Sequence, residues 1–202
     1  MRVRVAQAQI SPVFGDYAAN LVRFGELTAQ AVDEGCELLI LPETALSGYF
    51  LEGAVIEVAR STTDVLADLG ASYRASCPAG PPLDVLVGFY ELFESNVYNS
   101  ALYATLDAAG EPTVLHVHRK VYLPTYGMFD EGRFFAWGDS VRAFDTRFGR
   151  VGMLICEDFW HASPPYLLWL DGADVMLFMS SSPSRGLGTA AQLGSARWVN
   201  HI

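Results

Sequence analysis

Short apolar runs alternate with segments of helical periodicity along this chain, and that alternation limits the folds it can adopt. Residues Val3–Ile10 alternate apolar and polar side chains, which is typical of a strand. Tyr17–Glu34 places apolar residues at helical spacing, with Asp16 as the expected N-cap and Gly35 at the helix end. Glu37–Leu41 (ELLIL) is a second short apolar strand. A strand, a helix and a strand in this order predict a βαβ unit with a parallel pair of strands.

The same alternation continues along the rest of the chain. Further helices are predicted over Val55–Ala75, Pro164–Leu170 and Gly188–Val199. Further strands are predicted over Asp84–Phe89, Tyr98–Leu106, Pro112–His118, Val141–Thr146, Arg150–Ile155 and Asp174–Met179. Turns at Gly110 and Gly149 indicate two antiparallel hairpins, and Lys120–Gly138 is expected to be a long loop. This mixture predicts a layered α/β sandwich folded as one domain.

Composition narrows the class of protein. The 202 residues are 51% hydrophobic and 18% charged, which fits one compact soluble domain and excludes a disordered segment. The formal net charge of −10 argues against a nucleic-acid partner, because phosphate binding requires clustered Lys and Arg. No run of about 18 apolar residues is present to span a bilayer. The three cysteines show no C-x-x-C spacing, so we expect a cytoplasmic protein without a disulfide framework.

Three reactive side chains each follow an apolar strand, although they come from distant parts of the chain. Glu43 follows ELLILP, Lys120 follows VLHVHR and Cys156 follows VGMLI. In open α/β sheets ligands bind outside the carboxyl ends of the strands, so we expect these side chains to meet at a substrate site. Taken singly, each has a simpler interpretation as a solvated acid, an exposed lysine or a small buried cysteine.

Together the three residues form a workable set for acyl transfer from an amide. A thiol with a pKa of about 8.5 is mostly protonated at neutral pH and needs a base or a nearby cation to become a nucleophile. Glu43 can act as that base and then return the proton to a leaving amine. Lys120 can stabilise the thiolate and the oxyanion. If Cys156 occupies a strand-to-helix turn, the backbone N–H of Glu157 is a second oxyanion donor.

Three segments resemble the signature segments of the nitrilase superfamily, the carbon–nitrogen hydrolases: PETALSGY (Pro42–Tyr49), HRKVYLPTYGMFDEGRFF (His118–Phe135) and GMLICEDFW (Gly152–Trp160). The resemblance implies a four-layer αββα sandwich, with residues 1–202 as a single carbon–nitrogen hydrolase domain. It further implies that no cofactor and no metal is used. Glu43 would be the general base, Lys120 the transition-state stabiliser and Cys156 the nucleophile that forms a thioester. Glu131, in FDEG, best matches a second glutamate that many members carry.

The resemblance also indicates a substrate class. YLPTYGMFDEGRFF and CEDFWH look most like members that hydrolyse small amides, including the glutaminase domains of glutamine-dependent NAD synthetases. In such a protein Tyr49, Tyr126 and Phe129 would line the pocket, and Glu157 would bind substrate beside the nucleophile. Arg185, in SSSPSR, would contact a substrate carboxylate.

Partners follow from the same resemblance. A synthetase domain and a P-loop-like ATP site are not found in these 202 residues, so supplying ammonia would require a separate synthetase. The resemblance implies a homodimer or higher homo-oligomer. Family members continue with further strands and a tail after the last predicted helix, so we expect those C-terminal strands to be missing here.

Three other interpretations stay open. His116 and His118 face the same way on a predicted strand and, with Cys156 or an acid, could bind a metal. A non-catalytic nitrilase-like interaction protein is the second, although it would be expected to have replaced a Glu, Lys or Cys. A serine or papain-like hydrolase is the third, but G-x-S-x-G does not occur. His161 is five residues from Cys156, which suits a cap or a hydrogen bond beside the site better than a general base.

Overall fold

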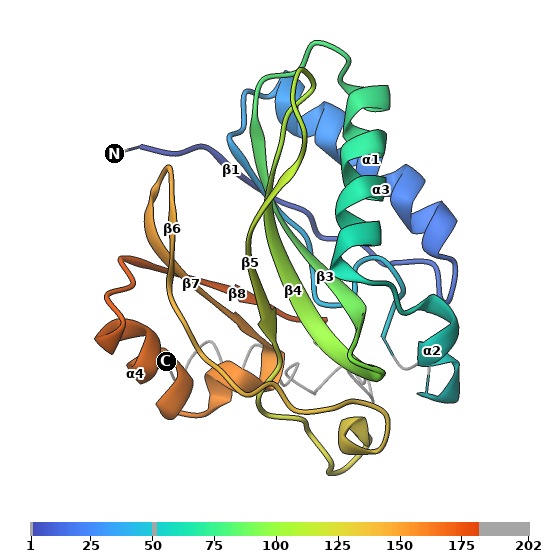
Figure 1. The fold of residues 1–202 in the computed structure, drawn as a ribbon, viewed down its shortest axis with the longest axis vertical. Coiled ribbons are helices and arrows are strands. Elements are labelled where there is room, and N and C mark those ends of the chain that lie inside the picture. The colour runs from blue at the N-terminus through green and yellow to red at the C-terminus, as the bar shows by residue number, and fades with distance from the viewer. Residues whose placement is uncertain (1, 50–51, 182–202) are drawn as a thin grey trace, which may run out of the picture.

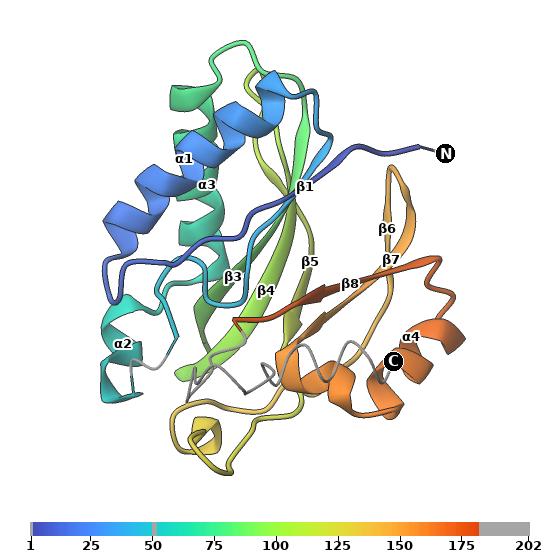
Figure 2. The same cartoon turned by 180° about the vertical axis from the view of Figure 1, so that it is seen from behind.

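The computed structural model describes residues 2–49 and 52–181 and forms four layers, in the order helices, sheet, sheet, helix (Figures 1 and 2). The first sheet contains the strands β1 (Val5–Gln7), β2 (Leu38–Ile40), β3 (Leu83–Phe93), β4 (Asn96–Leu106) and β5 (Thr113–Arg119). The second contains β6 (Phe144–Thr146), β7 (Gly149–Ile155) and β8 (Val175–Met179). The helices are α1 (Tyr17–Asp33), α2 (Val55–Val58), α3 (Thr62–Ser76) and α4 (Ser163–Leu170). The predicted αββα sandwich is thus confirmed.

The strand order explains how distant segments come together. In the first sheet β1, β2 and β3 are parallel, whereas β3, β4 and β5 are antiparallel neighbours. In the second sheet β6 pairs antiparallel with β7, and β7 pairs parallel with β8. The predicted βαβ unit is present: Asp16 caps α1 by accepting from the backbone N of Ala19 at 2.9 Å, and Gly35 follows the helix with φ +67°.

One predicted helix had the wrong bounds, and one hairpin was not predicted. The helix expected over Val55–Ala75 is two helices, because Arg60 pairs with the end of β3 instead. The backbone N of Arg60 donates to Tyr90 O at 3.0 Å, and Leu92 N donates to Arg60 O at 2.9 Å. Ser61 then caps α3. The hairpin between β3 and β4, with positive φ at Glu94 and Ser95, was not predicted either.

Other bounds are also corrected. Strand β1 is shorter than the alternating pattern of Val3–Ile10, and its residues are largely exposed. The helix expected over Gly188–Val199 lies outside the described residues.

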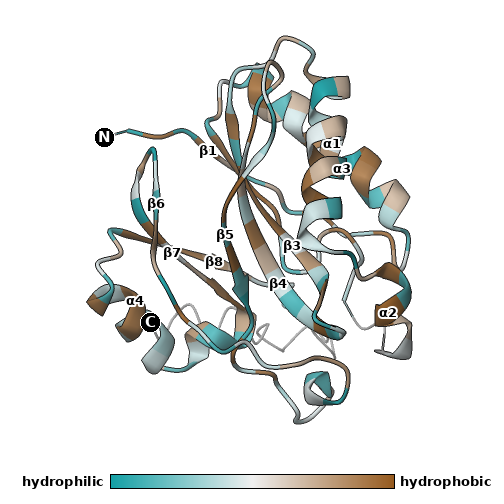
Figure 3. Ribbon diagram, viewed as in Figure 1, coloured by the Kyte–Doolittle hydropathy of each residue, from teal (hydrophilic) through white to brown (hydrophobic). Residues whose placement is uncertain are grey.

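The central strands β3, β4 and β7 are buried on both faces over most of their length, and Figure 3 shows the apolar residues that these strands carry. Along β3, Val85 and Val87 pack with α1 and α3, whereas Leu86 points between the sheets. On β7, Ile155 also packs between the sheets and Leu154 packs toward α4. The two sheets therefore share a core, and the ends of β2, β5 and β7 are held on a rigid frame.

Candidate active site

Glu43 lies on the loop that follows β2 and is completely buried. Its Oε1 accepts hydrogen bonds from Lys120 Nζ at 2.9 Å and from Asn99 Nδ2 at 2.8 Å. Its Oε2 accepts from the backbone N of Ser181 at 3.0 Å, just after β8. Strands of both sheets therefore orient this carboxylate.

The backbone around Glu43 packs directly against β3. A Cβ placed on Gly88 would lie 2.5 Å from Thr44 N and 2.6 Å from Pro42 O, so this close approach requires glycine. Thr44 has φ +54°, a conformation that β-branched residues rarely adopt. The buried Asn20 side chain holds the far part of the loop by donating to Leu46 O at 3.2 Å. The loop conformation is thus fixed by tertiary contacts.

Lys120 follows β5 directly and is also completely buried. Its backbone N donates to Asn99 O at 2.9 Å, and its Nζ donates to Glu43 Oε1 at 2.9 Å and to Glu131 Oε1 at 2.8 Å. Burial disfavours the charged ammonium, but the carboxylates of Glu43 and Glu131 outweigh it and raise the pKa of Lys120. The lysine is therefore a permanent cation in this site.

Glu131 begins a short 3-10 helix, η2 (Glu131–Arg133), inside the long loop after β5. Its buried Oε1 accepts from Lys120 Nζ and from the hydroxyl of Tyr49. Desolvation raises the pKa of Glu131 to about 7; Lys120 opposes this rise and Glu43 adds to it. Two carboxylates thus share one ammonium.

Cys156 comes at the end of β7 and begins the 3-10 helix η3 (Cys156–Trp160), so the expected strand-to-helix turn is present. Its φ is +46°, in the left-handed region that disfavours residues with a Cβ. Desolvation and the charge of Glu43 raise the pKa of the thiol to about 12, while Lys120 lowers it. The thiol of Cys156 therefore lies within electrostatic reach of Glu43, Lys120 and Glu131, and it retains its proton at neutral pH.

Glu157 and Tyr126 meet beside this thiol. The Tyr126 hydroxyl donates to Glu157 Oε2 at 2.7 Å, and His161 Nε2 lies 3.4 Å from Glu157 Oε1. His161 ends η3 and stacks on Tyr122 with ring centroids 3.8 Å apart. Since Tyr126 and His161 are exposed or partly exposed, these residues form the rim of the site.

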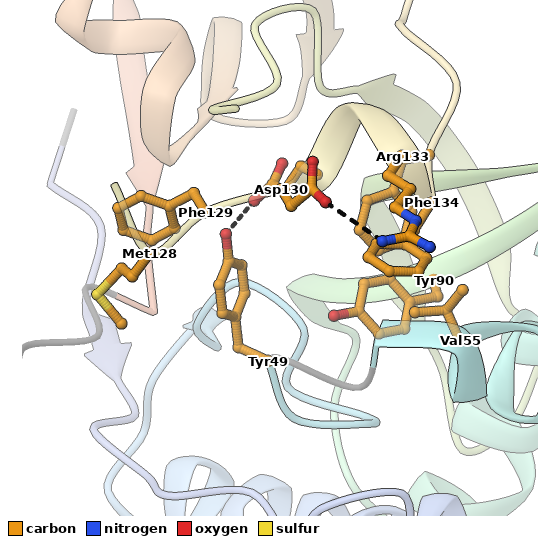
Figure 4. A pocket seen from close by; sticks show the side chains of 10 residues that line it. Tyr49, Val55, Tyr90, Met128, Phe129, Asp130, Arg133 and Phe134 are labelled. Atoms are coloured by element: carbon orange, nitrogen blue, oxygen red, sulfur yellow. Dashed lines mark hydrogen bonds and ion pairs between the residues drawn. The ribbon is translucent and has the colours of Figure 1, made fainter. Parts of the chain in front are cut away.

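A cavity of about 150 Å³ lies beside Glu131 (Figure 4). It is lined mainly by aromatic and apolar side chains together with two acids and an arginine: Tyr49, Val55, Tyr90, Met128, Phe129, Asp130, Glu131, Arg133, Phe134 and Phe135. Figure 4 shows Tyr49 in the middle, with Phe129 to one side and Tyr90 to the other. Tyr49 and Phe129 thus line a cavity, whereas Tyr126 lies outside it and packs edge-on against Phe129. Arg185 lies outside the described residues.

Two polar residues in this region were not predicted from the sequence to belong to the site. Asn99, on β4, donates to Glu43 through its side chain and accepts from Lys120 through its backbone. Asp158 is fully buried two residues after Cys156. Asp158 stands inside GMLICEDFW, and an acid embedded in so apolar a segment was a signal that it has buried partners.

The histidine pair considered for a metal has separate partners. Both rings lie on the face of β5 toward the second sheet, as strand alternation predicts. His116 stacks on Phe144 with centroids 4.7 Å apart, and burial lowers its pKa to about 4. His118 Nε2 is 2.8 Å from Asp158 Oδ2. Within residues 2–49 and 52–181, no three His, Cys, Asp or Glu side chains are grouped to hold a metal ion.

The fold, together with two buried glutamates and a buried lysine beside a partly buried thiol, defines the class of protein. A sequence profile of the carbon–nitrogen hydrolases matches residues 2–199, and the chain belongs to this family. The glutamine-dependent NAD(+) synthetase of Thermotoga maritima is 32% identical over 186 residues, which is 90% of this chain and 30% of that protein. The chain thus spans about a third of the length of such relatives.

Solved structures agree with this assignment. The glutamine-dependent NAD+ synthetase of Acinetobacter baumannii, solved with ADP, superposes with a TM-score of 0.72 at 30% identity, over 91% of this chain and 33% of that one. A carbon–nitrogen hydrolase from Helicobacter pylori superposes with a TM-score of 0.74 at 17% identity, over 98% of this chain and 65% of that one. The second likeness shows the fold alone.

Proposed function

We propose that this carbon–nitrogen hydrolase cleaves a small carboxamide to an acid and ammonia through a thioester on Cys156. The observation that carries the proposal is the fully buried Lys120 ammonium, held at 2.9 Å from Glu43 and 2.8 Å from Glu131, with the Cys156 thiol under the influence of all three charges. A buried cation beside a thiol and a carboxylate supplies the three functions that acyl transfer needs: a nucleophile, a base and an oxyanion partner.

In the first half of the reaction, Glu43 takes the proton from the thiol as sulfur attacks the carbonyl carbon. The raised pKa of the thiol means that this transfer accompanies attack, because the free thiolate is disfavoured. Lys120 has three N–H donors and uses two on the carboxylates, so its third can stabilise the oxyanion. The backbone N–H of Glu157 is the second donor. Glu43 then gives its proton to the nitrogen, and ammonia leaves.

In the second half, water replaces the amine. Glu43 takes a proton from the water, whose oxygen attacks the thioester carbon. The carbon–sulfur bond breaks, the acid leaves, and the proton on Glu43 returns to the thiol. Glu131 keeps the ammonium of Lys120 oriented throughout both halves, because its Oε1 accepts a second hydrogen bond from Nζ at 2.8 Å.

We propose glutamine as the amide. The support is the likeness to glutamine-dependent synthetases at 32% and 30% identity, together with the Tyr126–Glu157 pair at the rim, whose carboxylate can attract an α-ammonium group. Tyr49, Phe129 and Arg185 are proposed as further substrate-binding residues. In this role the domain would supply ammonia to a synthetase. Another small aliphatic amide is the second candidate. The non-catalytic alternative has less support, because Glu43, Lys120 and Cys156 are all present.

Further proposals concern the context of the site. We propose that residues 1–202 act as one domain, in a cytoplasmic homo-oligomer that uses no cofactor and binds neither nucleic acid nor membrane. Cys36, Cys77 and Cys156 are all free thiols, which suits a reducing compartment. None of the helices in the described part of the chain is long and apolar enough to cross a bilayer.

Ammonia release from glutamine and a panel of small amides tests the reaction. We expect Cys156→Ala and Glu43→Gln to abolish release, while Cys36→Ala and Cys77→Ala serve as matched controls that retain it, since both cysteines lie in the core beneath α1 and α3. Full activity of Cys156→Ala would refute the thioester route. Release from other amides but not from glutamine would favour the second candidate.

A further inference from the structure

Asp158 is a completely buried carboxylate that contacts the chain on both sides of Lys120. Its Oδ1 accepts hydrogen bonds from the backbone N of Val121 at 2.9 Å and of Tyr122 at 2.8 Å. These are the two residues after Lys120. Its Oδ2 lies 2.8 Å from Nε2 of His118, two residues before the lysine. Asp158 therefore contacts residues on both sides of Lys120 in the sequence.

The same carboxylate also closes the turn around Cys156. Asp158 is two residues after the cysteine, and its Oδ2 accepts from the backbone N of Ile155, the residue before it, at 3.1 Å. This bond closes the turn in which Cys156 adopts φ +46°. A non-glycine residue stays in such a conformation only where its surroundings enforce it. The bond to Ile155 is one such constraint.

We propose that Asp158 is a positioning residue that locks the lysine segment and the nucleophile turn into one rigid unit. The proposal rests on the hydrolytic function described above. Asp158 is not itself catalytic, because a carboxylate has about four acceptor positions and four partners already occupy them. Its role is to keep the ammonium and the sulfur at the separation that oxyanion stabilisation requires.

The energetic reason is that Asp158 satisfies three backbone N–H groups at once. Val121 and Tyr122 follow β5 of the first sheet, whereas Ile155 ends β7 of the second sheet, and Asp158 is an acceptor that all three backbone groups share. A buried donor without an acceptor is costly, so loss of the carboxylate would let the two segments separate. A displacement of about 1 Å between reacting groups can cost about 10²-fold in rate.

Asp158→Asn is the direct test, because it keeps the size of the side chain but can accept on only one side. In either orientation of the amide, its NH₂ group would face backbone N–H donors, which it cannot accept from. These donors are Val121 and Tyr122 in one orientation and Ile155 in the other. We expect kcat for amide hydrolysis to fall about 10²-fold while KM stays within about threefold, since no substrate contact is lost. A kcat close to that of the wild type would overturn the proposal.

Asp84→Asn is the matched control. Asp84 is equally buried and accepts from the Tyr103 hydroxyl and the Thr105 hydroxyl at 2.9 Å each, with Arg147 Nε at 3.3 Å. It lies outside the site. Both variants are expected to lower thermal stability, but only Asp158→Asn should lower kcat strongly. Equal losses of kcat in the two variants would show a general packing effect and would overturn the proposal.

His118→Gln provides a second variant if Asp158→Asn does not fold. It alters only one of the four partners, so we expect a decrease in kcat of several-fold at an unchanged KM. Unchanged kcat in a folded His118→Gln protein would contradict the positioning role.

Alkylation of Cys156 separates this proposal from the proposed function, because it needs no amide substrate. Iodoacetamide modification, followed by mass spectrometry at fixed pH, should be about tenfold slower in Asp158→Asn, since a displaced Lys120 lowers the pKa of the thiol less. Cys36 and Cys77 provide internal references. Wild-type protein that releases no ammonia but shows this difference would refute only the hydrolysis. An alkylation rate unchanged by Asp158→Asn would refute the positioning role.

Discussion

Lys120 Nζ donates to Glu43 Oε1 across 2.9 Å, and neither side chain is exposed to solvent. The two residues are 77 positions apart in the sequence and come from the ends of β2 and β5. A buried ion pair of this kind loses hydration on both sides, so its net contribution to stability depends on complete pairing. Here Asn99, Ser181 and Glu131 complete it. Removal of one partner should therefore have a large effect.

Lys120→Met should reduce both stability and turnover. It leaves Glu43 and Glu131 buried without a cation, which we expect to cost about 3–5 kcal/mol of unfolding free energy at pH 8. Turnover should fall by at least about 10²-fold because an oxyanion donor is lost. Urea unfolding and ammonia release measure the two effects. Arg147→Met, which breaks the pair with Asp84, is the control that should retain turnover. Near-normal turnover in Lys120→Met would contradict the assigned role.

The pKa of Glu131 predicts how stability depends on pH. In the folded protein this pKa is raised from 4.5 to about 7, mainly by desolvation. Between these two values the folded state binds more protons than the unfolded chain, so the contribution of this group to stability falls as pH rises. It is fully present below the unfolded value and is lost as pH passes through about 7. Lys120 stays charged throughout, because its pKa is raised.

Glu131→Gln isolates this contribution. The unfolding free energy of the wild type minus that of the variant should decrease from pH 4.5 to about 7, by at most about 1.4 kcal/mol per pH unit. Asp130→Asn, at an exposed neighbouring position, is the control for a general charge effect. A difference that stays constant or increases over this range would show that the pKa of Glu131 is not raised.

The positions of Glu43, Lys120 and Cys156 could be predicted from the sequence because each follows a strand: continuous apolar runs precede Glu43 and Cys156, and the alternating segment VLHVHR precedes Lys120. Such runs mark buried strands, and the residue after a strand lies at the edge of the sheet. The break at Ala59–Ser61 could not be predicted, because it depends on pairing of Arg60 with residues about thirty positions away on β3. Local helical periodicity continued across that break.

The buried hydrogen bonds of Asn99 and Asp158 could not be predicted for a related reason. Asn99 is oriented by Glu43, 56 positions earlier, and Asp158 by backbone N–H groups 36 and 37 positions earlier. A backbone donor has no signature in the sequence, so a carboxylate that binds one looks like any other buried acid. The sequence therefore indicates which polar residues follow the strands better than it indicates the buried partners that hold them.

Gly88→Ala tests whether the Glu43 loop needs its close approach to β3. The added Cβ would lie within 3 Å of the backbone of Pro42, Glu43 and Thr44, which cannot move without displacing the carboxylate of Glu43. We expect a stability loss of about 1–3 kcal/mol and a decrease in kcat of about 10²-fold. Gly53→Ala is the matched control, because nothing lies within 4 Å of its added Cβ. Normal kcat in a folded Gly88→Ala protein would show that the loop tolerates displacement.

The left-handed conformation of Cys156 predicts an unusual order of stability for two variants, Cys156→Gly and Cys156→Ala. At an ordinary helical position a protein with Gly is less stable than one with Ala by about 0.5–1 kcal/mol, because the unfolded chain with Gly is more flexible. At φ +46° the Cβ of Ala is strained and Gly is not. Cys156→Gly should therefore be more stable than Cys156→Ala, by about 1 kcal/mol. Ala18→Gly, at an exposed position of α1, should show the ordinary order in the same urea titrations. If Cys156→Gly were the less stable of the two, the turn at the nucleophile would store no strain.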